Sequence, residues 1–255
     1  PTVFFLYEDT TVKVLYKKSY QSIFAEDPWR NLTNVKQVAT CENGVVILFY
    51  DGTIITHYLQ LTGNLPSTEQ SKNVQKVFNN ADAFTLLYND GTIFCFGGYG
   101  ASTDSPDVSG VRDIFASKES WAALLEDLTV VTWGSSQNGG DSSAVASSLI
   151  SIDTIVSSES AHCALKRDKT VAACWGQALY IGNSPYQNFR GLMNIYSNTR
   201  GYAFVFEDGS VGWSGYIPYG DSQFPGDAEE YLWTIDANVE VVFSTDMSMC
   251  ALRQN

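Results

Sequence analysis

The sequence predicts an all-β protein that folds as a single closed β-propeller. Three observations lead to this prediction. A strand pattern recurs about every forty residues along the 255-residue chain. Most copies place an acidic turn between two apolar, β-branched segments. With 13% aromatic and only 17% charged residues, the composition suits a β-rich chain with a well-buried core. Repeats of this length, with three or four short strands each, are typical of propeller blades.

Each repeat opens with two apolar residues three positions apart, which indicates the buried side of a first strand. The pairs are Val35 and Val38, Val74 and Val77, Val111 and Ile114, Ile152 and Ile155, Leu192 and Ile195, and Val239 and Val242. Successive pairs are 39, 37, 41, 40 and 47 residues apart. The repeat units therefore start near residues 35, 74, 111, 152, 192 and 239.

A second strand follows and ends in a tight turn. Sixteen residues after the opening residue stands Asp51, Asp90, Asp127, Asp168, Asp208 or Asn255. The strand before this turn is apolar on both faces, as in 122–124, so we expect neighbouring blades to cover it from both sides. Asp-Gly at three of the turns is a strong hairpin signal. Asp127-Leu128 and Asp168-Lys169 depart from it and are expected to need a different turn or a bulge.

A third strand follows the turn, and it ends in Trp-Gly in the two most regular copies. The stretches "EDLTVVTWG" (126–134) and "RDKTVAACWG" (167–176) are therefore the same hairpin in adjacent blades. Because such a blade is a compact antiparallel sheet, we expect four strands in each blade and essentially no helix.

The two ends of the chain are predicted to close the ring together. An N-terminal copy has Leu6, Asp9 and Thr11 but no opening pair. From Val239 through the C-terminus and on from Pro1 to Val35 there are 51 residues, which fits one blade and not two. The N-terminal strands 3–16 should then join the C-terminal blade and leave no open sheet edge. Six blades in one domain, 1–255, are favoured, and seven incomplete blades are the alternative.

The repeat motif resembles that of a known family. The motif V-x-x-I-x-(S)-x(5)-A-L-x-x-D-G-T-V-x-x-W-G is best kept in Val111 to Gly134 and Ile152 to Gly176. It resembles the repeats of the regulator of chromosome condensation family over Val3 to Asn255. The resemblance implies a propeller, but the family includes exchange factors, inhibitors and scaffolds, so it implies no single function. The founding member of the family activates a small GTPase with the help of a protruding wedge and binds chromatin. No residues of this chain match that wedge, and its acidic balance argues against binding to chromatin.

Charge and hydropathy exclude two classes of partner. The formal net charge is -13, and the 15 basic residues are scattered, so a nucleic-acid partner is not expected. The longest apolar run, Val45 to Tyr50, is far too short to enter a membrane as a helix. The chain starts at Pro1 without an initiator Met, which is consistent with a processed N-terminus. A secreted or organelle-luminal location is slightly favoured over the cytoplasm, and the compartment stays open.

No catalytic set, metal site or cofactor site is predicted, and we expect a protein that is not an enzyme. The only histidines, His57 and His162, fall in strand columns otherwise held by apolar and aromatic residues. The repeated Asp column is explained by turn chemistry. The stretch "SSQNGGDSS" at 135–143 is a blade-connecting loop, because it lacks the Lys and the following helix of a phosphate-binding loop.

Five cysteines are too few and too widely spaced for a disulfide scaffold. Cys163 and Cys174 nevertheless face each other across the hairpin turn at Asp168-Lys169. A non-hydrogen-bonded cross-strand pair would bring their sulfurs close. The pair is either bridged, or consists of two buried thiols that fill small positions.

The sixth unit departs from its siblings and is the predicted partner site. Between Arg200 and Arg253 there is no basic residue, and aromatic side chains alternate with carboxylates. The predicted partner-binding residues are Tyr216, Tyr219, Phe224, Glu229, Glu230, Tyr231 and Trp233. Aromatic anchors rimmed by carboxylates suit a basic protein surface, whereas the alternative is a solvated loop.

Two functions are consistent with these patterns. The favoured hypothesis is a non-catalytic protein-interaction propeller, a rigid scaffold or inhibitor-type module that binds a protein through loops of one face, as a subunit of an assembly. The alternative is a carbohydrate-binding, lectin-like propeller. A lectin would be expected to repeat its site, yet the aromatics of the sixth unit have no counterparts in the other repeats.

Overall fold

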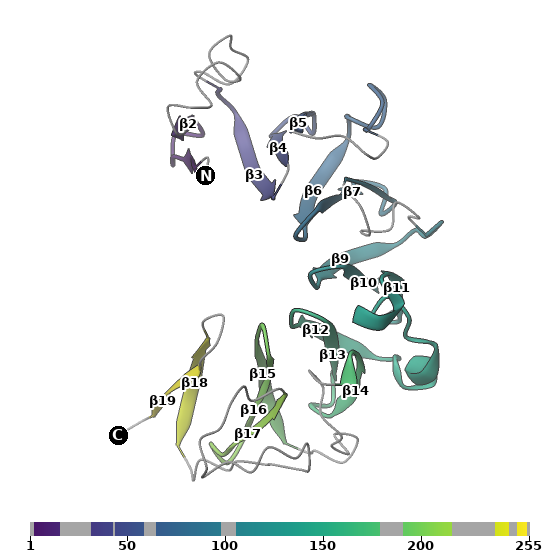
Figure 1. The fold of residues 1–255 in the computed structure, drawn as a ribbon, viewed down its shortest axis with the longest axis vertical. Helices are drawn as coiled ribbons and strands as arrows, with labels where there is room; N and C mark the ends of the chain where they lie inside the picture. Colours follow the sequence, from purple (N-terminus) through teal and green to yellow (C-terminus); the bar gives the residue numbers. More distant parts are fainter. Residues whose placement is uncertain are drawn as a thin grey trace. The chain divides into compact units, whose positions relative to one another are not determined.

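The computed structural model describes residues 3–15, 32–42, 44–58, 65–97, 106–178, 191–215, 238–244 and 249–253. The chain divides into two compact units, Pro1–Tyr99 (unit 1) and Gly100–Asn255 (unit 2), which we describe separately. In the described residues both units consist of small antiparallel sheets (Figure 1). For the described residues this confirms the prediction of an all-β chain built of small sheets.

The described residues of unit 1 form one two-stranded and two three-stranded sheets. The first pairs β1 (Val3–Leu6) with β2 (Val12–Leu15). The second is formed by β3 (Val35–Cys41), β4 (Gly44–Phe49) and β5 (Ile54–Tyr58). The third is formed by β6 (Val74–Asn79), β7 (Ala83–Tyr88) and β8 (Ile93–Gly97).

Unit 2 repeats the same arrangement. Its three-stranded sheets are β9 (Val111–Ala116), β10 (Ser120–Leu125) and β11 (Val130–Gly134); β12 (Ile152–Ser157), β13 (Ala161–Lys166) and β14 (Val171–Gly176); and β15 (Leu192–Asn198), β16 (Gly201–Phe206) and β17 (Val211–Gly215). A two-stranded sheet pairs β18 (Val239–Ser244) with β19 (Met249–Arg253). The predicted starts of the repeat units are the first residues of β3, β6, β9, β12, β15 and β18.

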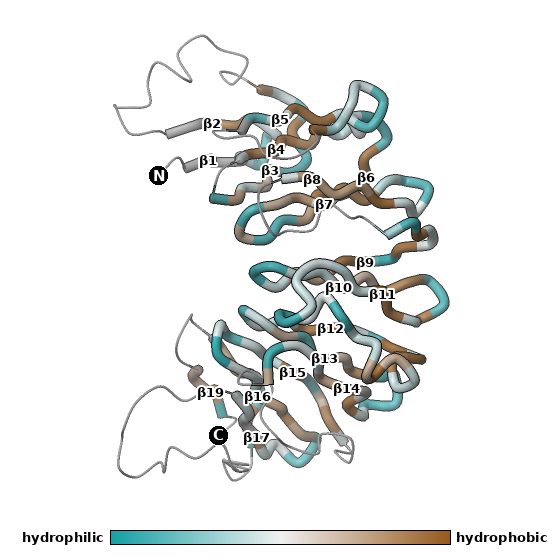
Figure 2. Tube along the Cα trace, turned by 45° about the vertical axis from the view of Figure 1, so that its right-hand side comes forward, coloured by the Kyte–Doolittle hydropathy of each residue, from teal (hydrophilic) through white to brown (hydrophobic). Residues whose placement is uncertain are grey.

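The middle strand of each three-stranded sheet is the most deeply buried part of its blade. Residues on both faces of β7, β10, β13 and β16 are buried, as the doubly apolar pattern predicts. Leu87, Leu124 and Leu165 are only 1%, 2% and 2% exposed, which confirms their assignment to the core. In Figure 2 the strands are mostly hydrophobic and the turns at their ends hydrophilic.

The repeated Asp column is turn chemistry, as predicted. In each turn the Asp Oδ1 accepts bonds from the amide and the hydroxyl of the Thr or Ser two residues later; in Asp51 these bonds from Thr53 measure 2.9 and 2.6 Å. The same pair of bonds occurs at Asp9, Asp90, Asp127, Asp168 and Asp208. These bonds stabilise the carboxylate and lower the pKa of each Asp.

The turns without glycine have the same form as the Asp-Gly turns, so the expectation of a different turn is wrong. The alternative, a bulge, is confirmed for the hairpin β13–β14, whose register shifts between Ala164 and Leu165, but not for β10–β11. The residue after the Asp has positive φ in every case: 81° at Gly52, 68° at Leu128 and 64° at Lys169. An L-residue with a side chain adopts this left-handed conformation at a cost. The two bonds to the Asp hold Leu128 and Lys169 in it.

Lys169→Gly should therefore stabilise unit 2 by about 0.5–1 kcal/mol, because glycine reaches positive φ without the Cβ clash. The exposed ion pair of Lys169 with Asp153, at 3.7 Å, contributes little to oppose this gain. The measurement is the free energy of unfolding in urea. Lys169→Ala is the matched control, because it removes the same ion pair and keeps the Cβ. Equal stability of the two variants would contradict the prediction.

A second left-handed residue precedes the first strands, and within each unit the strand that follows it bonds to the preceding turn, which the sequence interpretation missed. The residue before each first strand has positive φ, at Asn34, Asn73, Gly110, Ser151, Gly191 and Asn238. The first strand residue then donates its amide to the turn of the previous repeat, for example Val74 to Gly52 O at 2.9 Å and Ile152 to Leu128 O at 3.0 Å. A column of Asn, Gly and Ser just before the apolar pair was the available signal.

The blades differ from the sequence expectation in their number of strands and in the presence of short helices. The prediction of four strands per blade is wrong for the blade β9–β11, because the described residues between β11 and β12 contain no fourth strand. In the other sheets up to three strands lie within the described residues, and a fourth strand there stays a prediction. After β11 the chain instead forms two short 3-10 helices, η2 (Ser136–Asn138) and η3 (Ser143–Ser148). Side chains of β10 and β11 and of the turn before β10 bond to this segment at Asn138 and Ser142. The terminal strands form separate two-stranded sheets, β1–β2 and β18–β19. The composite closing blade, the blade number and the single domain stay predictions.

Candidate functional site

The candidate site is the end of unit 2 at which first and second strands are joined. We call it the hairpin end and define it by the turns 117–119, 158–160 and 199–200. Backbone bonds connect these turns from blade to blade. The Lys118 amide donates to Glu159 O at 2.9 Å, and the Glu159 amide donates to Thr199 O at 3.4 Å. The turns therefore form one continuous row with a fixed backbone.

Polar side chains fix the shape of each turn from inside. The Asn198 Oδ1 accepts bonds from the amides of Arg200 and Gly201 at 2.8 and 3.0 Å. Ser117 has the same place in its repeat, and its Oγ accepts a bond from the Ser120 amide at 3.0 Å. These caps satisfy backbone donors that the turns would otherwise leave unpaired.

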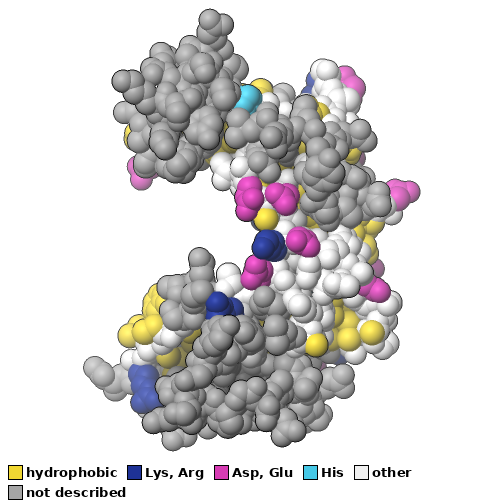
Figure 3. Space-filling model, in the orientation of Figure 1, with side chains coloured by type: hydrophobic (Ala, Val, Ile, Leu, Met, Phe, Trp, Pro, Cys, Tyr) yellow, Lys and Arg dark blue, Asp and Glu magenta, His cyan; other side chains and the backbone are white. Residues whose placement is uncertain are grey.

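The row carries exposed charges of both signs. Lys118 Nζ lies 3.2 Å from Glu159 Oε1, and these side chains are 51% and 33% exposed. Figure 3 shows basic and acidic side chains together near the ends of β9 and β12. Since the backbone of the row is uniform and its side chains differ, the hairpin end can present a specific pattern of charge.

Beneath the row lies a buried polar network around His162. The His162 Nε2 is 2.9 Å from Ser120 Oγ on β10, and its Nδ1 is 2.7 Å from Ser157 Oγ on β12. Ser120 Oγ also lies 2.6 Å from Asn138 O, in η2. The network therefore joins two neighbouring blades and the segment that follows β11.

The direction of these bonds follows from the carbonyl of Asn138. A carbonyl only accepts, so the single hydroxyl hydrogen of Ser120 goes to Asn138 O. His162 must then donate through Nε2–H to Ser120, and its Nδ1 accepts from the Ser157 hydroxyl. Complete burial lowers the pKa of His162 to about 3, so the ring is neutral near pH 7.

The network around His162 holds the segment 135–150 in place, and it is poorly suited to activate a serine as a nucleophile. Ser120 donates to a carbonyl and not to the imidazole. Ser157 does donate to the imidazole, but a histidine with a pKa of about 3 is a weak proton acceptor at neutral pH.

The segment 135–150 is docked by further bonds. Asn138 Nδ2 donates to Glu119 Oε2 at 2.7 Å, and Trp175 Nε1 donates to Gly139 O at 3.0 Å. The rings of His162 and Trp175 stack with centroids 5.4 Å apart. A Cβ on Gly139 would lie 2.6 Å from His162 Cδ2, so only glycine fits against the ring. The prediction of a blade-connecting loop is confirmed, and the loop is ordered by its contacts.

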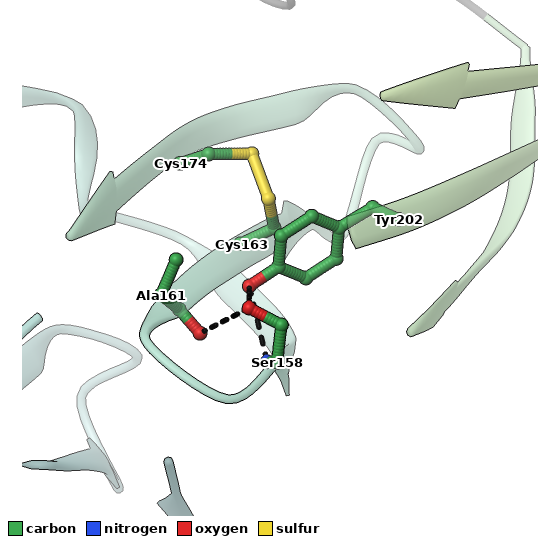
Figure 4. Close-up of a disulfide and its surroundings, with 5 residues drawn as sticks. All are labelled: Ser158, Ala161, Cys163, Cys174 and Tyr202. Atoms are coloured by element: carbon green, nitrogen blue, oxygen red, sulfur yellow. Dashed lines mark hydrogen bonds between the residues drawn. A yellow bond between two sulfur atoms is a disulfide. The ribbon is translucent and has the colours of Figure 1, made fainter. Parts of the chain in front are cut away.

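A disulfide joins β13 and β14, on the face of this sheet opposite to His162. Cys163 on β13 and Cys174 on β14 are directly opposite in register, with Cα atoms 4.0 Å apart. Cys163 is fully buried, whereas Cys174 is partly exposed. Close by, the Tyr202 hydroxyl of β16 donates to Ser158 Oγ at 3.0 Å and accepts a bond from the Ser158 amide at 3.1 Å (Figure 4).

The predicted partner residues, Tyr216 to Trp233, lie outside the described residues. Their segment follows β17, whose last residue, Gly215, pairs with Gly201 beside the turn 199–200. β17 therefore ends at the hairpin end.

The two histidines lie in different surroundings. His57 lies on β5 in unit 1, half-buried and opposite Val45, whereas His162 is buried in unit 2. Sequence reasoning placed His162 in its strand column but missed Ser120, Ser157 and Asn138 as its partners. Their distances along the chain gave no signal of contact, because three different elements supply them.

Two searches of the described residues were negative. No group of three or more His, Cys, Asp or Glu side chains there could hold a metal ion. In the same residues no helix has the length and apolar character needed to cross a membrane.

Comparison with known proteins identifies the fold. No protein-family model and no curated protein sequence matches the chain. Among solved structures, the ectodomain of the receptor kinase CR4 from Physcomitrella patens is similar with a TM-score of 0.56 and 13% identity, over 99% of this chain and 66% of the ectodomain. The chain thus spans slightly less than two thirds of that protein.

Yeast Prp20 is also similar. Prp20p from Saccharomyces cerevisiae, studied for its binding properties to Gsp1p and histones, matches with a TM-score of 0.52 and 14% identity, over 87% of this chain and 70% of Prp20p. Yeast RCC1 (Prp20) bound to Kap60 matches with a TM-score of 0.51 and 12% identity, over 86% and 68%. At these identities the likeness supports the β-propeller fold and no more.

Proposed function

We propose that this chain is a non-catalytic protein-interaction propeller that binds a protein partner at its hairpin end, as a scaffold or inhibitor-type module. The observation that carries the proposal is the row of turns 117–119, 158–160 and 199–200. Backbone bonds between blades fix the row, and its side chains differ from blade to blade. Binding residues are often placed on loops that a rigid scaffold positions.

Rigidity gives such a row an advantage in binding. A turn that is already ordered loses little conformational freedom when a partner docks, so more of the interaction energy appears as affinity. The caps on Ser117 and Asn198 and the docked segment 135–150 supply this order in unit 2.

The similar structures support a protein as the ligand class. Prp20p has binding properties to Gsp1p and histones, and it has been crystallised with Kap60. For this chain we propose a partner with a basic surface, because the sixth unit has carboxylates and aromatic residues but no basic residue between Arg200 and Arg253. A place as a subunit of an assembly follows from the same proposal.

The disulfide bears on the compartment. Protein disulfides persist mainly in oxidising environments, so Cys163–Cys174 favours a secreted or organelle-luminal location over the cytoplasm.

Removing aromatic anchors should weaken binding more than removing charge. Trp233→Ala or Tyr219→Ala is expected to lower affinity by about 2 kcal/mol or more, because anchors in a desolvated centre supply most of the binding energy. Glu229→Gln with Glu230→Gln should mainly slow association and flatten its salt dependence. The measurement is a binding titration at low and high salt against a partner captured from native extracts.

Three controls complete this experiment. A thermal melt of each variant separates lost binding from lost folding. Lys118→Ala with Glu159→Ala tests the turn row independently of the sixth unit. Binding to a glycan array without a protein partner would favour the carbohydrate alternative, and unchanged affinity in every variant would remove the hairpin end from consideration.

A further inference from the structure

We propose that the segment 135–140 is a proton-responsive latch over His162, which opens as the pH falls from 7 towards 5 and so regulates the turn row of the hairpin end. The latch itself is a property of unit 2; its consequence for binding rests on the proposed function. Three observations carry the inference: the segment is a thin cover on a buried ring, the bonds that hold it lie outside the strand ladders, and it binds a carboxylate of the turn row.

The segment covers the His162 ring as a thin layer. Gly139 is buried, and a Cβ on it would lie 2.6 Å from His162 Cδ2 and 3.1 Å from Nε2, so its backbone lies directly on the ring edge. Ser136 and Gln137 of the same segment are exposed. The other side chains that contact the ring come from β10, β12 and β14, which are held in sheets. Water therefore reaches the ring most readily when the segment lifts.

Side chains of the two blades hold the segment in place. Ser120 Oγ donates to the Asn138 carbonyl at 2.6 Å. Trp175 Nε1 donates to the Gly139 carbonyl at 3.0 Å, and Asn138 Nδ2 donates to Glu119 Oε2 at 2.7 Å. These bonds can break while the sheets β9–β11 and β12–β14 stay paired. Such a local opening requires less free energy than unfolding of the whole unit.

Protonation of His162 favours the open form. The groups that contact the ring are uncharged: the hydroxyls of Ser120 and Ser157, the indole of Trp175, and the backbone of Gly139. Of the charged side chains nearby, Glu119 bonds to Asn138 and Glu159 pairs with Lys118. A protonated ring would therefore find no counter-charge, and the Ser157 hydroxyl could no longer donate to Nδ1. Burial alone lowers the pKa of His162 to about 3 in the closed form, whereas an uncovered ring has the ordinary value of 6.5.

This position is titratable in one blade only. His162 is the second residue of its middle strand, and the residues at the same place in the other three-stranded blades are Val45, Phe84, Trp121 and Tyr202. None of these takes up a proton between pH 7 and 5. The ionisable ring therefore coincides with the segment that covers it, and this coincidence couples opening to pH.

Opening changes the turn row that the proposed function assigns to a partner. Glu119 belongs to the turn 117–119, and in the closed form its carboxylate accepts a bond from Asn138. When the segment lifts, this carboxylate is released beside Lys118 and Glu159. The row then offers an additional carboxylate to a basic partner.

The test is hydrogen exchange of the Trp175 indole N–H, measured by NMR on the folded chain at pH 7.5 and 5.0. This proton is bonded to the segment, so its rate, divided by that of a free indole, gives the opening constant. The constant should rise about thirtyfold at pH 5.0, as expected when opening raises the pKa of one histidine from about 3 to 6.5. Backbone amides of β13 should stay far better protected at both pH values. A ratio near one, or equal protection of the indole and β13, would overturn the inference.

Two variants assign the pH dependence to His162 and to its cover. His162→Gln removes the titrating ring, so its opening constant should not depend on pH; a ratio that persists in this variant would contradict the role of His162. In Gly139→Ala the Cβ pushes the segment off the ring, so His162 should titrate near pH 6.5 by NMR, whereas in the unchanged chain it should stay neutral down to about pH 5. A His162 ring that stays neutral at pH 5 in Gly139→Ala would show that the segment is not its cover.

These measurements need no partner, so the latch and the proposed function can fail separately. A flat opening constant overturns the latch even if a partner binds the turn row. Unchanged partner affinity in Lys118→Ala with Glu159→Ala overturns the turn row, and a thirtyfold opening ratio in the same chain still supports the latch.

Discussion

Leu124→Ala is expected to destabilise unit 2 by about 2–5 kcal/mol, the usual loss for a large side chain removed from a closed core. Leu124 is 2% exposed on β10 and packs with Ala122, Ile152 and Ala164, from its own blade and the next. Because two sheets enclose the site, the cavity can collapse only in part. The measurement is the free energy of unfolding from a urea titration.

The repeat itself supplies the control. Leu252 occupies the same column, three residues before the turn, but is 51% exposed on β19. Leu252→Ala should therefore lose far less stability, below about 1 kcal/mol. A loss below about 0.5 kcal/mol for Leu124→Ala would mean that β10 is not a middle strand of the core.

Acid should destabilise unit 2 through His162 well before the carboxylates titrate. Burial lowers the pKa of His162 from 6.5 to about 3 in the folded chain, so the unfolded chain binds the proton more tightly. The stability is complete above pH 6.5 and falls as the pH drops from 6.5 towards 3, by up to about 1.4 kcal/mol per pH unit. Unfolding in urea at several pH values between 6.5 and 4.5 measures this slope.

The choice of this pH window separates His162 from the Asp turns. Hydrogen bonds lower the pKa of the turn carboxylates below their ordinary value of 3.8, so their contribution is lost only at more acid pH. His162→Gln should be less stable at pH 7, because it breaks the bonds to Ser120 and Ser157, but its stability should vary little between pH 6.5 and 4.5. An equal pH slope in both proteins would exclude His162 as the cause.

Local sequence pattern was sufficient for the strands and their order. The apolar pair three apart, the doubly apolar middle strand and the Asp turn are all short-range features, since each is set by neighbours within one repeat. For the same reason the burial of Leu124 could be predicted. Cys163 and Cys174 lie opposite each other as predicted, but their pairing depends on a register shift between Ala164 and Leu165, which the equivalent hairpins of the other blades lack.

Turn conformation was only partly readable from sequence. Asp-Gly predicted positive φ at residue 52, but Leu128 and Lys169 adopt the same conformation without glycine. The side-chain bonds of the Asp override the local preference there, and a propensity argument gives no weight to them. The residue after such a left-handed position donates its amide to the previous repeat, as Val74 does to Gly52 O, so the role of the left-handed residue appears only when neighbouring blades of a unit are placed side by side.

The sequence by itself determined a chain of about forty-residue β repeats, their hairpins and their core columns. Only the tertiary structure decided how His162 is used and what the segment 135–150 becomes. His162 takes its partners from β10, β12 and η2, whose sequence separation reflects chain connectivity and not distance. A buried polar group must find hydrogen-bond partners wherever packing brings them, and that choice belongs to the assembled blades.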